Sequence, residues 1–157
     1  MQKIMPCLWF DDRIEDAVNF YTSVFPKSKI TTISRYGDAG PLPKGKVMVA
    51  LFELEGQEFM ALNGGPQFKF SEAISFFVKC ETQAEVDNYW TKLTADGGAE
   101  SMCGWLKDKF GLSWQIVPNA VSRYLSDKDP KKAQRVMEAM LKMKKIDIAT
   151  LDKVHAG

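Results

Sequence analysis

The feature that most restricts the fold of this chain is an internal repeat. The four residues that begin at Asn19 resemble the four that begin at Asn88, an offset of 69 (88 − 19), and both stretches show helical apolar spacing. Gly56 matches Gly111 at an offset of 55 (111 − 56). The first copy therefore carries 14 extra residues (69 − 55) between helix and hairpin, where the Gly- and Pro-rich stretch 37–45 predicts a loop. We predict two copies of one βαβββ unit.

Local signals predict the elements of the first copy. The apolar stretch 3–10 has the composition of a strand, and the Asp11-Asp12 pair, with Glu15 three positions beyond Asp12, is typical of a helix N-cap. The remaining elements are expected to be a helix that ends at Pro26, an extended segment at 29–36 and a hairpin over 46–63 that turns at Gly56.

The second copy repeats this order. Thr82 and Glu85 form the capping box of a second helix, which the Gly97-Gly98 pair ends. Its buried stripe is predicted to be Val86, Tyr89, Trp90 and Leu93. The strands of this copy are expected at 73–80, at two short segments within 99–109, and at 110–118.

Residues 119–157 depart from the repeat and are predicted to form a helical tail. One helix is expected to start near Pro130, with lysines on its solvated side, and a shorter one to follow Asp147. The apolar stripe of the first tail helix is predicted to be Val136, Met137, Met140 and Leu141. The expected organisation is one α+β domain, with paired modules over 1–118 (1–66 and 70–118) and the tail.

The composition argues against several classes of partner. The chain has 21 Lys and Arg against 20 Asp and Glu, so no footprint for nucleic acid or an anionic membrane is expected. No apolar run is long enough to cross a bilayer and no signal-peptide pattern stands at the N-terminus, which predicts a cytoplasmic protein. Cys7, Cys80 and Cys103 lack metal-binding spacing and are expected to be reduced. A small molecule is the favoured partner.

Three motifs together resemble a known family. They are FDDRIEDAVNFYTSVFP (10–26), LNGGP (62–66) and CGWLKDKFGLSWQIVP (103–118). With the paired βαβββ plan, they are similar to the vicinal oxygen chelate superfamily, which includes glyoxalases, bleomycin-resistance proteins and extradiol dioxygenases. The PhnB-like branch is the most similar, and its members often carry the name 3-demethylubiquinone-9 3-methyltransferase. The resemblance extends to MLKMKKIDIATL (140–151) in the tail.

The resemblance implies where metal ligands would stand. In the superfamily they lie on the inner face of the sheet, on the first and last strands of each repeat. Carried over by family spacing and by the offsets, these positions are Pro6, Met60, Ser75 and Gln115. Proline and methionine do not coordinate a hard divalent ion, serine rarely does, and one amide oxygen is a weak ligand. We therefore predict no metal and no other cofactor, with Gln115 facing a ligand cavity.

Strand alternation predicts the rest of that inner face. If Gln115 faces the cavity, Trp114 faces a helix; if Pro6 does, Cys7 and Trp9 face a helix. Such a lining suits a flat or aliphatic ligand, unless the residues simply pack together or against a second chain. The predicted ligand residues are Leu8, Phe10, Met60, Leu62, Ser75, Phe77, Trp105, Ser113 and Gln115, with Val117 on the same face.

Several functions remain open at this level. We favour metal-free binding of an apolar or aromatic molecule in a cup at a homodimer cleft. The branch name implies a methyltransferase, but the glycines of 62–66 do not open a helix as a nucleotide-binding turn does. Metal-dependent lyase, isomerase or dioxygenase chemistry lacks its ligands, and a metal-free enzyme would use Asp108 or Glu58 as base. The residues leave open whether the chain is an enzyme.

Overall fold

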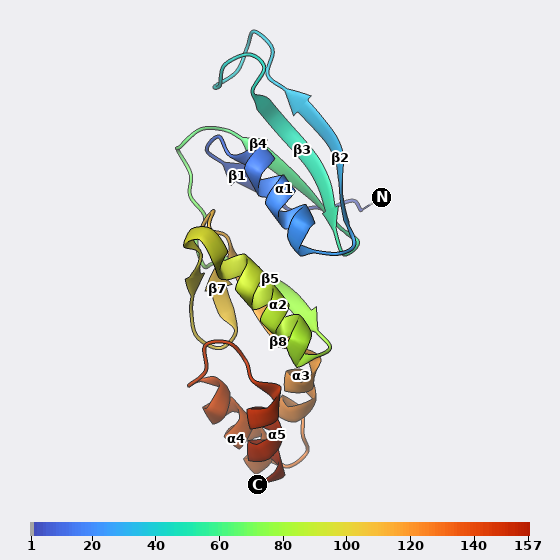
Figure 1. The fold of residues 1–157 in the computed structure, drawn as a ribbon, viewed down its shortest axis with the longest axis vertical. Helices are drawn as coiled ribbons and strands as arrows, with labels where there is room; N and C mark the ends of the chain where they lie inside the picture. Colours follow the sequence, from blue (N-terminus) through green and yellow to red (C-terminus); the bar gives the residue numbers. More distant parts are fainter. Residues whose placement is uncertain (1) are drawn as a thin grey trace. The chain divides into compact units, whose positions relative to one another are not determined.

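Each copy of the repeat forms a four-stranded sheet of its own. The structure is a computed structural model that describes residues 2–157, and the chain divides into two compact units, Met1–Phe70 and Ser71–Gly157. The order of elements in each unit is strand, helix and three strands, as the repeat predicts (Figure 1). The fold is therefore α+β, built from two βαβββ units with helices at the C-terminal end.

The first unit places one helix across a mixed sheet. The strand order is β1-β4-β3-β2, with β1 parallel to β4 and the other pairs antiparallel. Tyr21 of the helix is buried and its ring stacks on that of Phe52. The Phe52 ring in turn stacks on that of Phe59. The elements are β1 (Cys7–Phe10), α1 (Ile14–Val24), β2 (Ser28–Arg35), β3 (Val47–Leu54) and β4 (Gln57–Asn63).

A residue far away in the sequence caps helix α1. The cap predicted at Asp11-Asp12 is wrong, because the N-cap residue is Arg13 and its side chain makes no capping hydrogen bond. Asn63, buried at the end of β4, accepts a hydrogen bond from the Ile14 N–H (3.2 Å) and donates one to the Val47 carbonyl (2.9 Å). A buried amide needs such partners. Asn63 therefore ties the helix to the sheet.

The second unit follows the prediction closely. Its strand order is β5-β8-β7-β6, with β5 parallel to β8. Thr82 accepts the Glu85 N–H (3.2 Å) as the capping box requires, and the predicted stripe of α2 is buried. The elements are β5 (Ser75–Cys80), α2 (Gln83–Thr94), a 3₁₀ turn η1 (Ala95–Gly97), β6 (Ala99–Glu100), β7 (Trp105–Lys107) and β8 (Ser113–Pro118).

The tail adds three helices to the second unit: α3 (Asn119–Leu125), α4 (Pro130–Met140) and α5 (Ile148–Ala156). The starts of α4 and α5 agree with the prediction, and Asp129 and Asp147 cap them. The tail has a core of Val117, Val121, Val136, Met140, Ile146 and Leu151.

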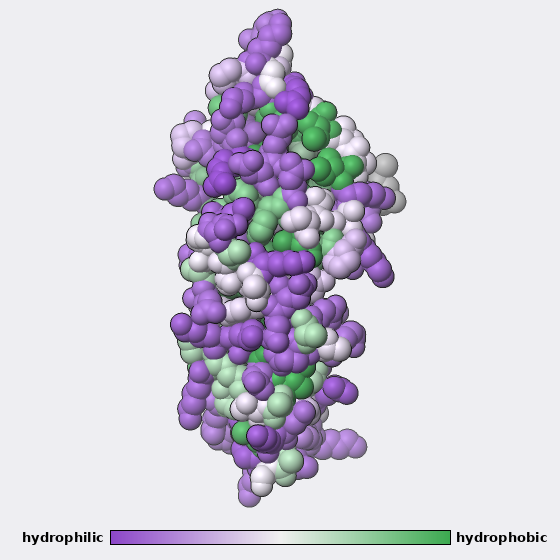
Figure 2. Space-filling model, in the orientation of Figure 1, coloured by the Kyte–Doolittle hydropathy of each residue, from purple (hydrophilic) through white to green (hydrophobic). Residues whose placement is uncertain are grey.

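The apolar stripe predicted for α4 is half wrong. Val136 and Met140 are buried, but Met137 and Leu141 are 42% and 59% exposed. Apolar patches of this kind lie between hydrophilic residues on the visible surface of the tail (Figure 2). Adjacent helix positions are about 100° apart, so one member of each pair faces the core and the other turns outward.

Helix α2, at 12 residues the longest described, is too short to cross a bilayer.

Candidate functional site

Each unit has its own candidate surface on the open face of its sheet, meaning the face that the helix of the same βαβββ unit does not cover. In β8, Trp114 and Ile116 are buried on the α2 side, while Gln115 points the other way. Paired residues on neighbouring strands share a face, so the strand register decides which side chains join Gln115.

Gln115 lies between two aromatic residues on this open face. The register pairs it with Phe77 on β5 and with Trp105 on β7. Phe77 is 52% exposed and Trp105 is half-buried. The three side chains form an aromatic–amide–aromatic row across the sheet, which offers apolar surface for stacking and an amide for hydrogen bonding.

A polar row adjoins it, made of Ser75, Ser113 and Lys107. The Gln115 Nε2 donates to the Ser75 Oγ at 2.9 Å, which joins the two rows. Lys107 forms an ion pair with Glu72, and the hydrogen bond from its ammonium lowers the pKa of the Glu72 carboxyl.

Ser113 is the unusual member of the polar row. Its side chain is 1% exposed, and its Oγ has no hydrogen-bond partner among residues 2–157. An unpaired buried hydroxyl costs about 1 to 3 kcal/mol, and such groups in folded proteins usually have a reason. A ligand that supplies the missing hydrogen bond is one such reason.

The indole of Trp105 differs from those of the other three tryptophans. Trp9, Trp90 and Trp114 donate their Nε1–H groups to Gly65, Glu100 and Asp108 respectively. The Trp105 Nε1–H has no such partner among the described residues. Composition could not reveal this difference, because it depends on tertiary contacts.

The open face of the first unit is apolar, but its residues differ from those predicted. The register pairs Cys7 with Met60 and Trp9 with Leu62, so these four share the open face. The expectation that Leu8 and Phe10 lie there is wrong. They pair with Ala61 and Asn63 and are 6% and 4% exposed on the α1 side.

The error has a simple physical cause. Pro6 precedes β1, and its carbonyl accepts the Met60 N–H (2.9 Å). Strand side chains alternate, so choosing Pro6 instead of Cys7 as the partner of Met60 moves every residue of β1 to the wrong face. Both faces of this strand are apolar in sequence. The alternation of its side chains therefore could not show that the predicted register was one residue off.

The superfamily's metal site is not supported by the donors present. Met60 lies among apolar side chains, Gln115 is bonded to Ser75, and Pro6 carries no donor side chain. Within residues 2–157, no group of three or more His, Cys, Asp and Glu side chains is placed to hold a metal ion. A hard divalent ion needs several oxygen ligands, so these residues do not fit one.

The Gly64-Gly65 pair does not form a cradle for a nucleotide cofactor. Its two N–H groups donate to the carbonyls of Phe10 (3.0 Å) and Asp11 (3.1 Å). A Cβ on Gly64 would lie 2.2 Å from the Trp9 ring, so glycine is required here for close packing. A methyltransferase would bind the methyl donor S-adenosylmethionine. This turn does not fit that cofactor, because its N–H groups already donate to protein carbonyls.

Of the two candidate bases, Asp108 has a structural role, and Glu58 on β4 accepts a hydrogen bond from the Gln2 N–H (3.1 Å). Asp108 is 2% exposed and accepts hydrogen bonds from the Phe110 and Leu112 N–H groups and the Trp114 indole. Burial raises the pKa of Cys7, and burial together with the charge of Glu85 raises that of Cys80 to about 12, which opposes thiolate formation.

A surface groove of about 440 Å³ lies elsewhere, in the tail. None of the predicted ligand residues lines it, and no buried unpaired polar group points into it, so we assign it no ligand. Its lining is Arg135, Glu138, Ala139, Lys142, Lys153, Val154 and Gly157.

Comparison with known proteins places the chain in a family. The model of the family described as 3-demethylubiquinone-9 3-methyltransferase matches residues 2–117. The PhnB protein of Bacillus cereus, which carries the same methyltransferase name, is 43% identical, with a TM-score of 0.69 over 74% of this chain and 99% of that one. No curated protein matches.

Two more distant structures share the fold. The fosfomycin resistance protein FosX of Listeria monocytogenes, complexed with Mn(II) and sulfate, is 13% identical with a TM-score of 0.50, over 73% of this chain and 88% of that one. A glyoxylase/bleomycin resistance protein/dioxygenase domain from Frankia is 15% identical with the same TM-score, over 75% and 92%. The chain therefore belongs to the 3-demethylubiquinone-9 3-methyltransferase (PhnB-like) family, and it shares its fold with the two more distant structures.

Proposed function

We propose that the protein is a metal-free small-molecule-binding protein of the glyoxalase/bleomycin-resistance type. Its ligand is apolar or aromatic and bears one hydrogen-bonding group. The observation that carries the proposal is the buried, unpaired hydroxyl of Ser113 beside the Phe77–Gln115–Trp105 row. A flat ring stacks on the side chains of Phe77 and Trp105, and its polar group reaches Ser113 or the amide of Gln115.

The donor chemistry favours binding over catalysis. The positions that the superfamily resemblance assigns to metal ligands carry Pro6, Met60, Ser75 and Gln115, and the Asp108 carboxylate already accepts three hydrogen bonds. In the turn at Gly64 and Gly65, both N–H groups donate hydrogen bonds to carbonyls of the protein itself. Methyl transfer is suggested by the family name alone. Leu62 and Met60 give the first unit's open face an apolar surface suited to the same class of ligand.

Titration with 2-naphthol, a flat aromatic molecule with one hydroxyl, tests this function. We expect Ser113→Ala to weaken binding about tenfold through the loss of one hydrogen bond, while the melting temperature stays unchanged or rises. The reason for the second effect is that the hydroxyl has no protein partner to lose. Calorimetry and thermal melts measure the two quantities, and adding EDTA should change neither.

The matched control is Gln57→Ala, which removes a half-buried amide on β4 bonded to Gln2. It should leave 2-naphthol binding unchanged, whereas Gln115→Ala should weaken it. Absence of binding by the wild type, or a Ser113→Ala variant that loses stability and keeps its affinity, would contradict the proposal.

We also propose that the protein is a homodimer whose subunits enclose the ligand cleft. Each sheet leaves two edge strands, β1 and β2 in one unit and β5 and β6 in the other, and each has an open face with apolar residues. Edges and faces of this kind are commonly covered by a second copy. Light scattering at micromolar concentration should give twice 17.7 kDa. A mass of one chain would exclude the dimer.

A further inference from the structure

The connection between α4 and α5, residues 141–147, runs along the loop that precedes β7. The Cys103 N–H donates to the Met143 carbonyl (2.7 Å) and the Gly104 N–H to the Lys144 carbonyl (2.8 Å). On the other side, the Gly104 carbonyl accepts the Ile116 N–H (2.8 Å). Gly104 is thus hydrogen-bonded to β8 and to the tail at once.

Gln83 fixes the same connection to helix α2. Its Nε2 donates to the Ile146 carbonyl (3.0 Å), and its Oε1 accepts the Ile148 N–H (2.8 Å). Beside it, Lys145 pairs with Asp87 at 2.8 Å, and this hydrogen bond lowers the pKa of the Asp87 carboxyl. The side chain of Ile146 is fully buried. One glutamine therefore holds two backbone groups of the tail, on either side of Asp147.

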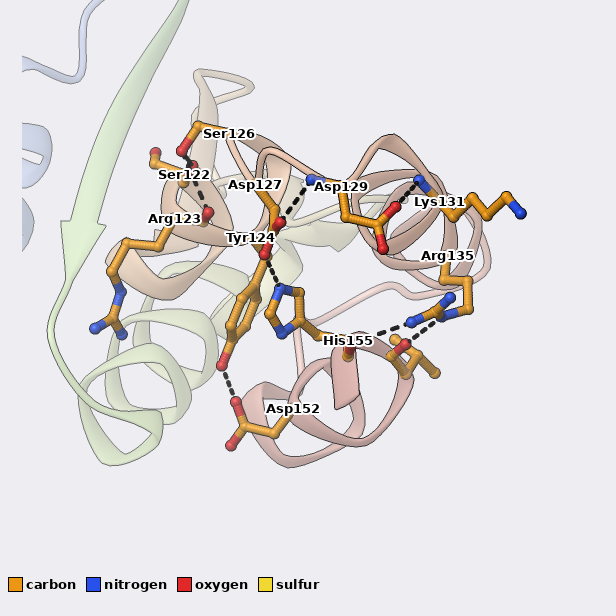
Figure 3. Close-up of polar contacts among 11 residues, drawn as sticks. Ser122, Arg123, Tyr124, Ser126, Asp127, Asp129, Lys131, Arg135, Asp152 and His155 are labelled. Carbon is orange, nitrogen blue, oxygen red and sulfur yellow. Dashed lines mark hydrogen bonds and ion pairs between the residues drawn. The ribbon is translucent and has the colours of Figure 1, made fainter. Parts of the chain in front are cut away.

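The far side of the tail is closed by contacts of its own (Figure 3). His155 Nε2 lies 2.7 Å from the Asp127 carboxylate, and the His155 ring packs on that of Tyr124, whose hydroxyl bonds to Asp152. The backbone N–H of Asp129 and the His155 ring lower the pKa of Asp127. These contacts join the end of α5 to α3. Helix α5, in which the connection 141–147 ends, is therefore itself held in place by α3.

We infer that residues 141–147 are a strap that positions Trp105 on the ligand-binding face. Gly104 is the residue directly before Trp105, and Trp105 pairs with Gln115. The strap lies outside the residues that the family model matches, 2–117. The inference rests on the proposed function in that Trp105 contacts the ligand. Gln83 is then a positioning residue, acting on the site only through the strap.

The variant Gln83→Leu keeps the size of the side chain and removes both hydrogen bonds to the strap, together with the bond from the Gln83 Nε2 to Asp87 (3.0 Å). We expect amide exchange at Cys103 and Gly104 to accelerate about tenfold, because their acceptors lie on the released strap. The indole N–H resonance of Trp105 should shift, and the Kd for 2-naphthol should rise about threefold to tenfold at temperatures well below the melting transition. Nuclear magnetic resonance measures all three effects.

The control is Gln134→Leu, which removes an exposed glutamine of α4 that bonds only to Glu138 (2.8 Å). It should leave all three readouts unchanged. If Gln83→Leu accelerates exchange but leaves the Trp105 resonance in place, the strap is a tether and the inference fails. It fails equally if exchange at Gly104 is unaffected. If the wild type does not bind 2-naphthol, the proposed ligand is wrong. The inference about the strap is then still decided by the two other measurements, amide exchange at Gly104 and the position of the Trp105 indole resonance.

Discussion

Replacing Asp108 by alanine is expected to lower the free energy of unfolding by about 3 to 5 kcal/mol. The carboxylate is 2% exposed and serves as acceptor for two backbone N–H groups and the Trp114 indole, at 2.8, 3.1 and 2.9 Å. Alanine leaves three donors in a buried turn without their acceptor. Urea denaturation, compared with the wild type, measures the loss.

Two further aspartate variants sharpen this prediction. In Asp108→Asn the carbonyl oxygen keeps the bonds from the Phe110 and Leu112 N–H groups, but the amide N–H₂ opposes the Trp114 indole N–H. The loss should therefore be intermediate. Asp38→Ala removes a 90% exposed carboxylate paired with Lys44 and should change stability by less than about 0.5 kcal/mol. An Asp108→Ala variant as stable as Asp38→Ala would show that the turn does not depend on Asp108.

Asp108 also shows why sequence alone could not decide the role of some candidate residues. An acidic residue in a charged turn beside a glycine is compatible with a general base or with a structural acceptor. The choice depends on whether backbone N–H groups converge on it, which local composition does not encode. The same holds for Asn63, whose capping of α1 joins residues 49 positions apart.

The elements themselves were largely predictable because their signals are local. The capping box at Thr82, the turn at Gly56 and the aspartate cap at Asp147 each depend on a few neighbouring residues. The buried stripe of α2 followed from spacing alone. Strand faces were predictable only where one face is polar, as for Gln115 in β8. In β1 both faces are apolar, and the register with β4 was needed to place Leu8 and Phe10 correctly.

The second large effect is expected at Gly104, where alanine should lower the free energy of unfolding by about 3 kcal/mol or more. Gly104 has a φ of +83°, and a Cβ there would lie 2.8 Å from the Ile116 carbonyl oxygen and 2.9 Å from the Ile146 Cδ1. The first contact is with backbone that is held in the sheet, so it cannot be relieved by a side-chain rotation. Such a substitution presses β8 and the strap apart at the point where both bond to Gly104.

Gly111 offers a matched control for this prediction. Its φ is +85°, nearly the same as that of Gly104, but a Cβ there meets nothing within 4 Å. Gly111→Ala should therefore lose only the cost of a left-handed backbone, about 1 to 2 kcal/mol. The difference between the two variants in urea denaturation isolates the contacts with Ile116 and Ile146 from the shared conformational strain. Equal losses would mean that β8 and the strap do not close on Gly104, and the packing that places Trp105 beside Gln115 would have to be abandoned.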